Sequence, residues 1–304
     1  MQRSRKKTVL QIADIPKDAL ILWVSTGSPL EVKERLDGMG FRHFSYLAFF
    51  KYSGFDLVHP PFITDFKEDF KNNPKRYENV YNLLADEKSK TLFKKVLNFK
   101  ISFDYEFMKG FTNDHTGQYF DKEILPRLTN ICFVDGGGYV GDTATEVIKN
   151  YPDFKKIYLI EPIAENIRIA KRELGTYQNI EFLTLGVSDK KTTLYFNEEK
   201  SFSTIYGKGT QSVEVNTIDN LIKEKVDFIK LDIEGAEQDA IEGAKNTIKK
   251  HHPILAICVY HKAEDFYMII EKVLAIRSDY SVYFRHYMEG IFESVVYFTP
   301  NTND

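Results

Sequence analysis

The fold of this chain is decided by Val134-Asp135-Gly136-Gly137-Gly138-Tyr139-Val140-Gly141-Asp142, a glycine-rich stretch in a sequence of 304 residues. An apolar run over 131–134 leads into it and predicts a buried strand, and the pattern over 143–150 predicts a helix after it. Glycines at such a turn let the backbone bend tightly and approach a ligand without a Cβ clash. The stretch therefore predicts a ligand site between a strand and a helix.

Strand and helix patterns continue to alternate through the rest of the chain. Further strands are predicted over 157–160, 180–185, 228–232 and 253–260, with helices over 164–174, 236–249 and 263–276. This alternation predicts a mostly parallel sheet with helices on both faces. The segments 281–287 and 294–299 predict a terminal antiparallel hairpin. Segments 192–197 and 211–215 predict an inserted hairpin with its tip at 201–209.

The region before the sheet is predicted to be an α/β and helical extension. A strand is expected at 19–24 and another at 44–50. Ser28-Pro29-Leu30-Glu31 between them predicts a helix start, with Ser28 as N-cap in a capping box. Residues 60–120 carry helical patterns. We therefore divide the chain into an N-terminal region, 1–116, and a second domain, 117–304.

Composition excludes several classes of protein. The formal net charge is -3, so no basic field would attract nucleic acid. Apolar runs are too short for stable membrane insertion. Cys132 and Cys258 lie in apolar runs and are expected to be reduced core thiols. We expect a cytoplasmic protein, for which a homo-oligomer is compatible with the composition.

Two cofactor motifs overlap in the glycine stretch. The dinucleotide fingerprint G-x-G-x-x-G is matched by Gly136, Gly138 and Gly141. The methyltransferase loop D-x-G-x-x-x-G is matched by Asp135, Gly137 and Gly141. A pyrophosphate at a helix N-terminus disfavours nearby carboxylates. Asp135 and Asp142 flank the loop and instead suit a cofactor that carries an amino group and a sulfonium, so the second motif is favoured.

A second segment, Phe228-Ile-Lys-Leu-Asp-Ile-Glu-Gly-Ala-Glu237, strengthens this interpretation. Together with Asp135-Gly-Gly-Gly-Tyr-Val-Gly141 and Glu161-Pro162 it resembles the FkbM family of methyltransferases. That family typically has D-x-G-A-x-x-G, then E-P, then K-x-D-x-E-G-x-E, and Gly138 stands where alanine is commoner. The resemblance covers about 117–300 and extends to Gln118-Tyr-Phe120, Val259-Tyr-His-Lys262 and Arg285-His-Tyr287.

The resemblance implies a Rossmann-like class I methyltransferase sheet and the cofactor S-adenosyl-L-methionine. It also implies O-methylation of a hydroxyl on a sugar, a polysaccharide precursor or a related metabolite, so the partner would be a small-molecule or glycan acceptor. Two alternatives stay open. One is an NAD-dependent oxidoreductase or epimerase that uses the same glycine loop, and the other is a catalytically inactive binding module.

The predicted cofactor site lies at the carboxyl ends of the strands. Glu161 ends the second strand, where a carboxylate can accept hydrogen bonds from a ribose diol. Asp135 and Gly137 are expected beside the methionine part, and Val187 and Ser188 beside the adenine. The full predicted set is Asp135, Gly136, Gly137, Gly138, Gly141, Asp142, Glu161, Pro162, Asn166, Val187, Ser188 and Asp232.

Three residues are predicted to be catalytic. His261 follows the fifth strand at the ligand-binding edge and is a candidate base, with His286 in the hairpin as its rival. Asp232 follows the fourth strand at the same edge. Asp232, Glu234 and His261 could also give a mixed oxygen and nitrogen site for a divalent metal. Their spacing matches no dedicated ligand motif, so no metal ligand is assigned.

Overall fold

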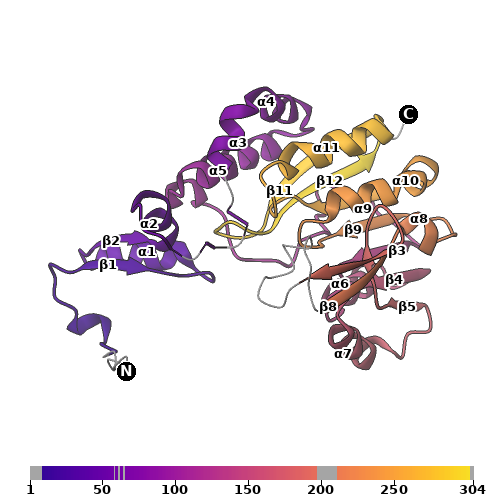
Figure 1. Ribbon diagram of the computed structural model, residues 1–304, viewed down its shortest axis with the longest axis horizontal. Coiled ribbons are helices and arrows are strands. Elements are labelled where there is room, and N and C mark those ends of the chain that lie inside the picture. The colour runs from indigo at the N-terminus through magenta and orange to yellow at the C-terminus, as the bar shows by residue number, and fades with distance from the viewer. Residues whose placement is uncertain (1–8, 58, 61, 64–65, 197–210, 302–304) are drawn as a thin grey trace.

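A seven-stranded sheet forms the centre of the computed structural model, which describes residues 9–57, 59–60, 62–63, 66–196 and 211–301 (Figure 1). Its order is β11-β12-β10-β9-β3-β4-β5. Neighbours among β3, β4, β5, β9 and β10 pair in parallel, and β12 is antiparallel to β10 and β11. The predicted parallel sheet with a terminal hairpin is confirmed. The strands are β3 (Cys132–Gly136), β4 (Lys156–Ile160), β5 (Ile180–Leu183), β9 (Phe228–Leu231), β10 (Ile254–Cys258), β11 (Tyr280–His286) and β12 (Ser294–Pro300).

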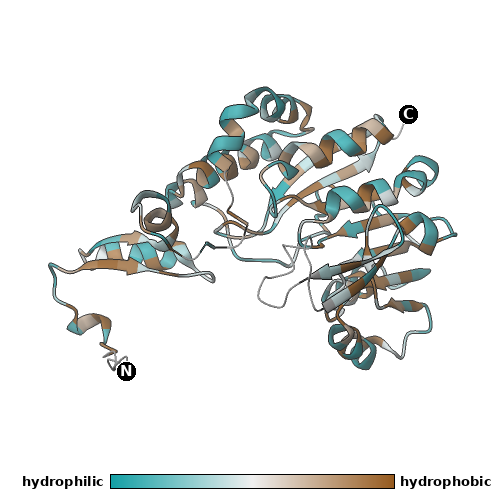
Figure 2. Ribbon diagram, in the orientation of Figure 1, coloured by the Kyte–Doolittle hydropathy of each residue, from teal (hydrophilic) through white to brown (hydrophobic). Residues whose placement is uncertain are grey.

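Helices cover both faces of this sheet, so its inner strands are buried on both sides. Phe133 of β3 packs in one apolar cluster with α6 (Asp142–Asn150) and α7 (Ala164–Leu174). The next residue, Val134, packs in a second cluster on the opposite face. Figure 2 shows apolar strands between helices with hydrophilic outer surfaces. The helices of the second face are α8 (Ile218–Leu221), α9 (Glu237–Gly243), α10 (Lys245–His251) and α11 (Asp265–Ile276).

A small three-stranded sheet is inserted after β5. It has the order β6-β8-β7, with β6 (Gly186–Val187), β7 (Thr192–Phe196) and β8 (Gln211–Asn216). β7 and β8 are antiparallel, which confirms the predicted inserted hairpin. The predicted tip at 201–209 lies outside the described residues. β6 brings Val187 and Ser188 beside the carboxyl ends of the large sheet.

The N-terminal region begins with a strand–helix–strand unit. β1 (Leu20–Trp23) pairs in parallel with β2 (Arg42–Ser45), and α1 (Pro29–Gly38) connects them. The predicted helix start is confirmed, but the predicted capping box is wrong, because the Ser28 side chain makes no cap hydrogen bond. Instead, a carboxylate oxygen of Glu289 accepts a hydrogen bond from the Leu30 amide at 3.2 Å.

The strand predicted over 44–50 is wrong for most of its length. β2 ends at Ser45, and α2 (Tyr46–Tyr52) follows at once. The Ser45 hydroxyl accepts a hydrogen bond from the Ala48 amide at 3.2 Å and so caps this helix. A short aromatic run fits a strand and a buried helix equally well. The N-cap hydrogen bond of Ser45 stabilises the helix here.

Further helices connect the strand–helix–strand unit to the large sheet. They are α3 (Phe66–Asn72), α4 (Pro74–Leu83) and α5 (Glu87–Ser102), with a short 3-10 turn at Tyr105–Met108; another 3-10 turn, Ile12–Asp14, precedes β1. Phe93 of α5 packs edge-on against Phe284 of β11, with ring centroids 5.3 Å apart. One apolar cluster runs from Trp23 to Phe298 across the predicted domain boundary. No helix in the described ranges is both long and apolar enough to cross a lipid bilayer.

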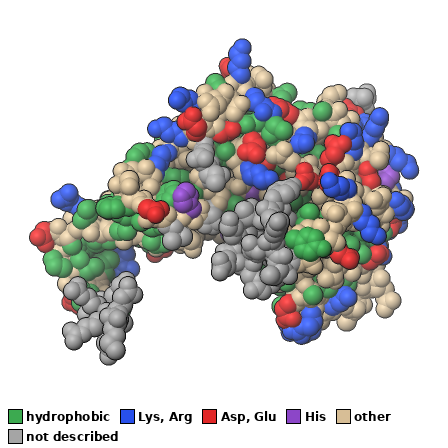
Figure 3. Space-filling model, viewed as in Figure 1, with side chains coloured by type: hydrophobic (Ala, Val, Ile, Leu, Met, Phe, Trp, Pro, Cys, Tyr) green, Lys and Arg blue, Asp and Glu red, His purple; other side chains and the backbone are tan. Residues whose placement is uncertain are grey.

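The surface of the N-terminal unit differs from the rest of the molecule. On the face shown in Figure 3, hydrophobic side chains gather on the arm at the left, where β1 lies. Leu20, Leu22 and Val24 are exposed there and belong to neither apolar cluster. Elsewhere on this face, acidic and basic side chains are interspersed. The visible surface therefore shows no single-sign patch of charge.

Candidate active site

A cavity of about 630 Å³ opens at the carboxyl ends of the parallel strands. Open α/β sheets bind their ligands at this edge. Residues after β3, β4, β9 and β10 line it, together with the inserted sheet and a segment before β3. Eight predicted residues lie on its wall: Gly137, Asp142, Glu161, Pro162, Asn166, Val187, Ser188 and Asp232. Six others are not among the lining residues: Asp135, Gly136, Gly138, Gly141, His261 and His286.

Gly137 is required by a close approach between two parts of the protein. Its φ is +80°, and an added Cβ would lie 1.8 Å from the backbone oxygen of Asp232. Any side chain would therefore separate the glycine loop from the end of β9. The sequence predicted glycine for approach to a ligand, whereas in the fold the loop also packs directly against the turn that carries Asp232.

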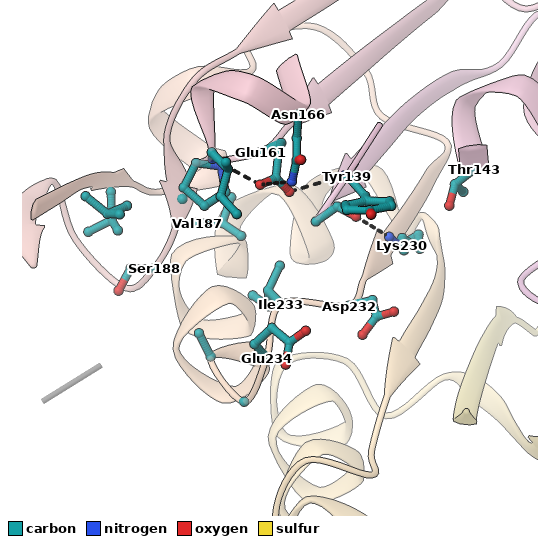
Figure 4. A pocket seen from close by; sticks show the side chains of 18 of the residues that line it. Tyr139, Thr143, Glu161, Asn166, Val187, Ser188, Lys230, Asp232, Ile233 and Glu234 are labelled. Atoms are coloured by element: carbon teal, nitrogen blue, oxygen red, sulfur yellow. Dashed lines mark hydrogen bonds between the residues drawn. The ribbon is translucent and has the colours of Figure 1, made fainter. Parts of the chain in front are cut away.

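Glu161 is fixed at the end of β4 by three hydrogen bonds (Figure 4). Its carboxylate accepts from the backbone amides of Tyr139 at 3.2 Å and Ile163 at 3.0 Å, and from the side-chain amide of Asn166 at 3.2 Å. The residue is buried yet lines the cavity. A carboxylate held this way is oriented before a ligand arrives, as the ribose prediction requires.

Asp135 and Lys230 form an ion pair beneath the glycine loop. They are register partners on β3 and β9, and the Lys230 Nζ lies 3.0 Å from Asp135 Oδ1. Nζ also donates a hydrogen bond to the Gly137 carbonyl at 2.7 Å. Burial raises the pKa of Asp135, and Lys230 offsets part of that effect. The pair therefore fixes the loop, and Lys230 is a wall residue to which the sequence assigned no role.

Asp232 presents its carboxylate to the cavity between two tyrosines. The Tyr119 hydroxyl donates to Oδ2 at 2.8 Å, and the Tyr260 hydroxyl donates to Oδ1 at 3.1 Å. Burial alone would raise the pKa of Asp232. The positive charges of Lys230 and His261 and the hydrogen bonds from both phenols lower the pKa by more than burial raises it. The pKa is lowered, so Asp232 is an anion at neutral pH.

A polar wall from outside the predicted site completes the cavity. His115 Nδ1 lies 3.0 Å from the Gln118 side-chain oxygen, and the Gln118 amide donates to the carboxylate of Glu293. Burial raises the pKa of Glu293. The sequence noted the triplet around Tyr119 but assigned these residues no role. His115 and Glu293 lie far apart in the chain and carry no shared motif, so no sequence signal joins them.

His261 is buried, and its side chain is only 1% exposed. The edge of its ring meets Phe62, with centroids 4.8 Å apart. Its Nδ1 lies 3.1 Å from Glu237 Oε1, and its Nε2 lies 3.6 Å from Asp232 Oδ1. Burial alone would lower the pKa of His261, but the surrounding carboxylates outweigh it and raise the pKa to about 9.

His286 lies away from the cavity wall. Its Nδ1 lies 2.9 Å from the Ser294 hydroxyl, and its ring packs against Phe111 at 4.9 Å. Burial, with the nearby Lys100, lowers the pKa of His286 to about 3. The two predicted bases are therefore not brought together. We assign His286 a packing role in the hairpin in place of a role in the reaction.

Comparison with known proteins gives one family match. Residues 135–282 match the family model described as the methyltransferase FkbM domain. A crystal structure of the methyltransferase FkbM from Methylobacillus flagellatus KT is similar to this chain, with a TM-score of 0.77 and 24% identity. The match covers 91% of this chain and 73% of that one. A search of curated proteins finds no match.

More distant solved structures are also methyltransferases. An rRNA methylase from Streptococcus thermophilus has 12% identity and a TM-score of 0.38, over 59% of this chain and 91% of that one. Fibrillarin from Aeropyrum pernix, with natively bound S-adenosyl-L-methionine, has 14% identity and a TM-score of 0.37. That match covers 58% of this chain and 69% of the other.

The matched domain supports an S-adenosylmethionine-dependent methyltransferase, and the structural match shows a Rossmann-like class I sheet. Within that class, residues 135–282 match the FkbM methyltransferase domain, which confirms the resemblance stated from the motifs. The cavity residues fit this cofactor. A fixed carboxylate, Glu161, is available for the ribose, and the described residues of the wall carry more carboxylates than ammonium groups, which favours a sulfonium.

Proposed function

We propose that this methyltransferase transfers a methyl group to a hydroxyl of a sugar, a polysaccharide precursor or a related metabolite. The observation that carries the proposal is the Asp232 carboxylate, held by two phenols on the wall of the cofactor cavity. Figure 4 shows Asp232 and Glu161 on opposite sides of this cavity. One carboxylate is thus available for the cofactor and the other for the acceptor.

The charge of the wall favours this proposal over a dinucleotide enzyme. Six carboxylates line the cavity, from Asp142, Glu161, Asp232, Glu234, Asp239 and Glu293. Among the described lining residues only two carry ammonium groups, Lys230 and Lys262, and Lys230 is paired with Asp135. A pyrophosphate would be repelled by this wall, whereas a sulfonium and an uncharged polyol are accepted.

Asp232 is proposed to receive the hydroxyl proton of the acceptor. S-Adenosylmethionine supplies, when bound, a methyl group on a sulfonium that leaves as a neutral thioether. As the acceptor oxygen is methylated, its proton becomes strongly acidic, and even a carboxylate with a lowered pKa can accept it. Tyr119 and Tyr260 hold Asp232 in a fixed orientation, which is mainly a positioning effect.

The remaining polar groups of the wall suit a polyhydroxyl acceptor. His115, Gln118 and Glu293 offer both donors and acceptors of hydrogen bonds on one side of the cavity. We also propose a cytoplasmic location without a nucleic-acid partner. Its support is the net charge of -3 and the two free, buried thiols of Cys132 and Cys258.

Calorimetry with S-adenosylhomocysteine and with NAD tests the cofactor half of the proposal. We expect the wild type to bind the former and not the latter. Glu161→Ala should weaken that binding by about 1.5–3 kcal/mol, the value of a hydrogen bond to a charged group. Glu165→Gln, an exposed acid on the next helix, is the control and should bind like wild type. Unchanged affinity in a folded Glu161→Ala protein would contradict the ribose assignment.

Turnover of Asp232→Asn tests the acceptor half. The variant should still bind S-adenosylhomocysteine within a few-fold of wild type, because Asp232 is assigned to the acceptor. Transfer of labelled methyl groups to a panel of sugars and glycans should fall by about 10²–10⁴-fold, as for loss of a general base. Near-wild-type transfer by the folded variant would remove Asp232 from the reaction.

A further inference from the structure

One face of the small parallel sheet in the N-terminal unit is apolar and exposed. Side chains alternate along a strand, and Ile21 and Trp23 of β1 pack into the larger apolar cluster. Leu20, Leu22 and Val24 point the other way and are 56%, 43% and 72% exposed. Single exposed apolar residues are ordinary, but a whole row on one strand marks a surface that another element covers.

Aromatic rings extend this row across β2 and α2. Leu22 is the register partner of Phe44, and register partners of a parallel pair lie on the same face. The ring centroid of Phe44 lies 5.4 Å from that of Phe49, which lies 5.7 Å from that of Phe55. All three rings lie outside both apolar clusters, and Phe55 is 66% exposed. The resulting surface is the arm face, which consists of Leu20, Leu22, Val24, Phe44, Phe49 and Phe55.

The sheet beneath the arm face lacks one of its two layers. Among the described strands, β1 and β2 pair only with each other. Leu30 and Leu36 of α1 share a cluster with Trp23 and so cover one side. A sheet buries its apolar face against a second layer, and two strands alone are only marginally stable in water. A partner on the arm face would supply the layer that is missing from the described part of the chain.

The size of the arm face fits a pair of copies. Its exposed apolar surface is roughly 500 Å², because large side chains offer about 150–250 Å² each and these are partly covered. Two copies that pack arm face to arm face would remove about 1,000 Å² from water, which is the lower bound for a specific interface. Packed sheets lie about 10 Å apart, which leaves room for one layer of interdigitated side chains.

The charges around the arm face also favour a second copy. Arg42 is the register partner of Leu20, Asp18 lies just before β1, and Asp56 follows Phe55. All three charged residues are exposed. A rim that carries both signs can meet its own copy without net repulsion. An anionic membrane surface would instead select for basic residues around the apolar patch.

We propose that the arm face binds the arm face of a second copy of this chain, so that the protein is a dimer with twofold symmetry. A twofold axis at Leu22 sets this side chain against its own counterpart and Leu20 against Val24 of the partner subunit. Apolar side chains then meet along the whole row. None of the arm-face residues lines the cofactor cavity, so that cavity stays accessible in the dimer.

Analytical ultracentrifugation of the full chain at a series of concentrations tests the dimer. We expect a monomer–dimer equilibrium in the micromolar range, as is usual for interfaces of modest area. Leu22→Glu would bury two like charges at the axis and should make the protein a monomer throughout. Leu83→Glu, at a 49% exposed leucine on α4, is the matched control and should dimerise like wild type. A wild type that stays monomeric, or a Leu22→Glu protein that still dimerises, overturns the proposal.

A milder variant keeps the test decisive if Leu22→Glu does not fold. Val24→Ser removes apolar surface from a 72% exposed position without adding a charge. It should weaken dimerisation about tenfold, because each dimer loses the side chain twice. Circular dichroism and S-adenosylhomocysteine binding on the same samples establish that each variant is folded. Wild-type dimerisation by the folded Val24→Ser protein would also overturn the proposal.

Cosedimentation with vesicles tests the other partner that an exposed apolar face could have. The probes are vesicles of phosphatidylcholine alone and of phosphatidylcholine with phosphatidylglycerol. We expect the wild type to remain in the supernatant with both. Binding to either kind of vesicle by a monomeric wild type, lost in Leu22→Glu, would assign the arm face to a membrane and overturn the dimer.

Discussion

Lys100 on α5 is a buried ammonium group. Its removal should raise the free energy of unfolding at neutral pH and lower it at high pH. Its Nζ donates a hydrogen bond to the Ile291 carbonyl at 2.8 Å and lies 5.0 Å from the centre of the Phe66 ring. Burial lowers the pKa of Lys100 from 10.5 to about 7. Lys100→Met keeps the length of the side chain but removes both the charge and the hydrogen bond.

Two opposing contributions set the change in stability caused by Lys100→Met: relief of the buried charge and loss of the hydrogen bond. The unfolded chain binds more protons at Lys100 than the folded chain between pH 7 and 10.5, so this group destabilises the fold at pH 7 and stops doing so as pH rises. At 1.36 kcal/mol for each pKa unit, the effect is about 4–5 kcal/mol. Loss of the hydrogen bond leaves the Ile291 carbonyl unpaired, which costs about 1–3 kcal/mol at every pH.

Lys100→Met should therefore be more stable than wild type at pH 7, by about 2–3 kcal/mol, and less stable at pH 10. Urea unfolding, followed by circular dichroism at pH 7, 8, 9 and 10, measures the gain in stability at pH 7 and the loss at pH 10. Lys94→Met, an exposed position on the same helix, is the control, and its difference from wild type should stay small throughout. A Lys100→Met protein that is less stable by the same amount at every pH would refute the reasoning.

Two further substitutions test packing around the site. Gly137→Ala should abolish S-adenosylhomocysteine binding in calorimetry, because its Cβ would lie 1.8 Å from the Asp232 carbonyl and force the loop outward; wild-type affinity would show that the loop has room. Arg285→Met should cost about 3–5 kcal/mol in urea unfolding, because it leaves the carboxylates of Asp86 and Asp121 without their buried partner. This loss of unfolding free energy should shrink as pH falls through the pKa of Asp86, which is about 2 in the folded chain. A loss that does not change with pH would rule out the ion pairs as its cause.

Periodic patterns in the sequence predicted the large sheet well, for a physical reason. Strands buried on both faces are mostly apolar, and β3 and β9 are buried throughout, with the paired Asp135 and Lys230 as their charged residues. The aromatic segment over α2 failed because seven residues are too few to separate the two periods. The capping box failed because the partner of α1, Glu289, lies more than 250 residues away.

Most of the predicted residues on the cavity wall lie at or directly after strand ends, and Asp142 and Asn166 lie on the helices that follow. Glu161 and Asp232 follow β4 and β9, and both lie on the cavity wall. His286 was predicted from its neighbours in sequence, but alternation along β11 cannot tell which side borders the cavity. Glu293 reaches the wall from the turn before β12, and only tertiary contact with Gln118 reveals it.

The origin of the cavity wall has a consequence for how such enzymes could diverge. Glu161 and Asp232 lie within residues 135–282, whereas His115, Gln118 and Glu293 belong to flanking segments. Substitutions in the flanks can therefore change which acceptor fits while the cofactor groove stays intact. A library restricted to 111–118 and 287–293 should yield variants with altered acceptor preference and undiminished affinity for S-adenosylhomocysteine, which makes these two short loops the natural place to redesign specificity.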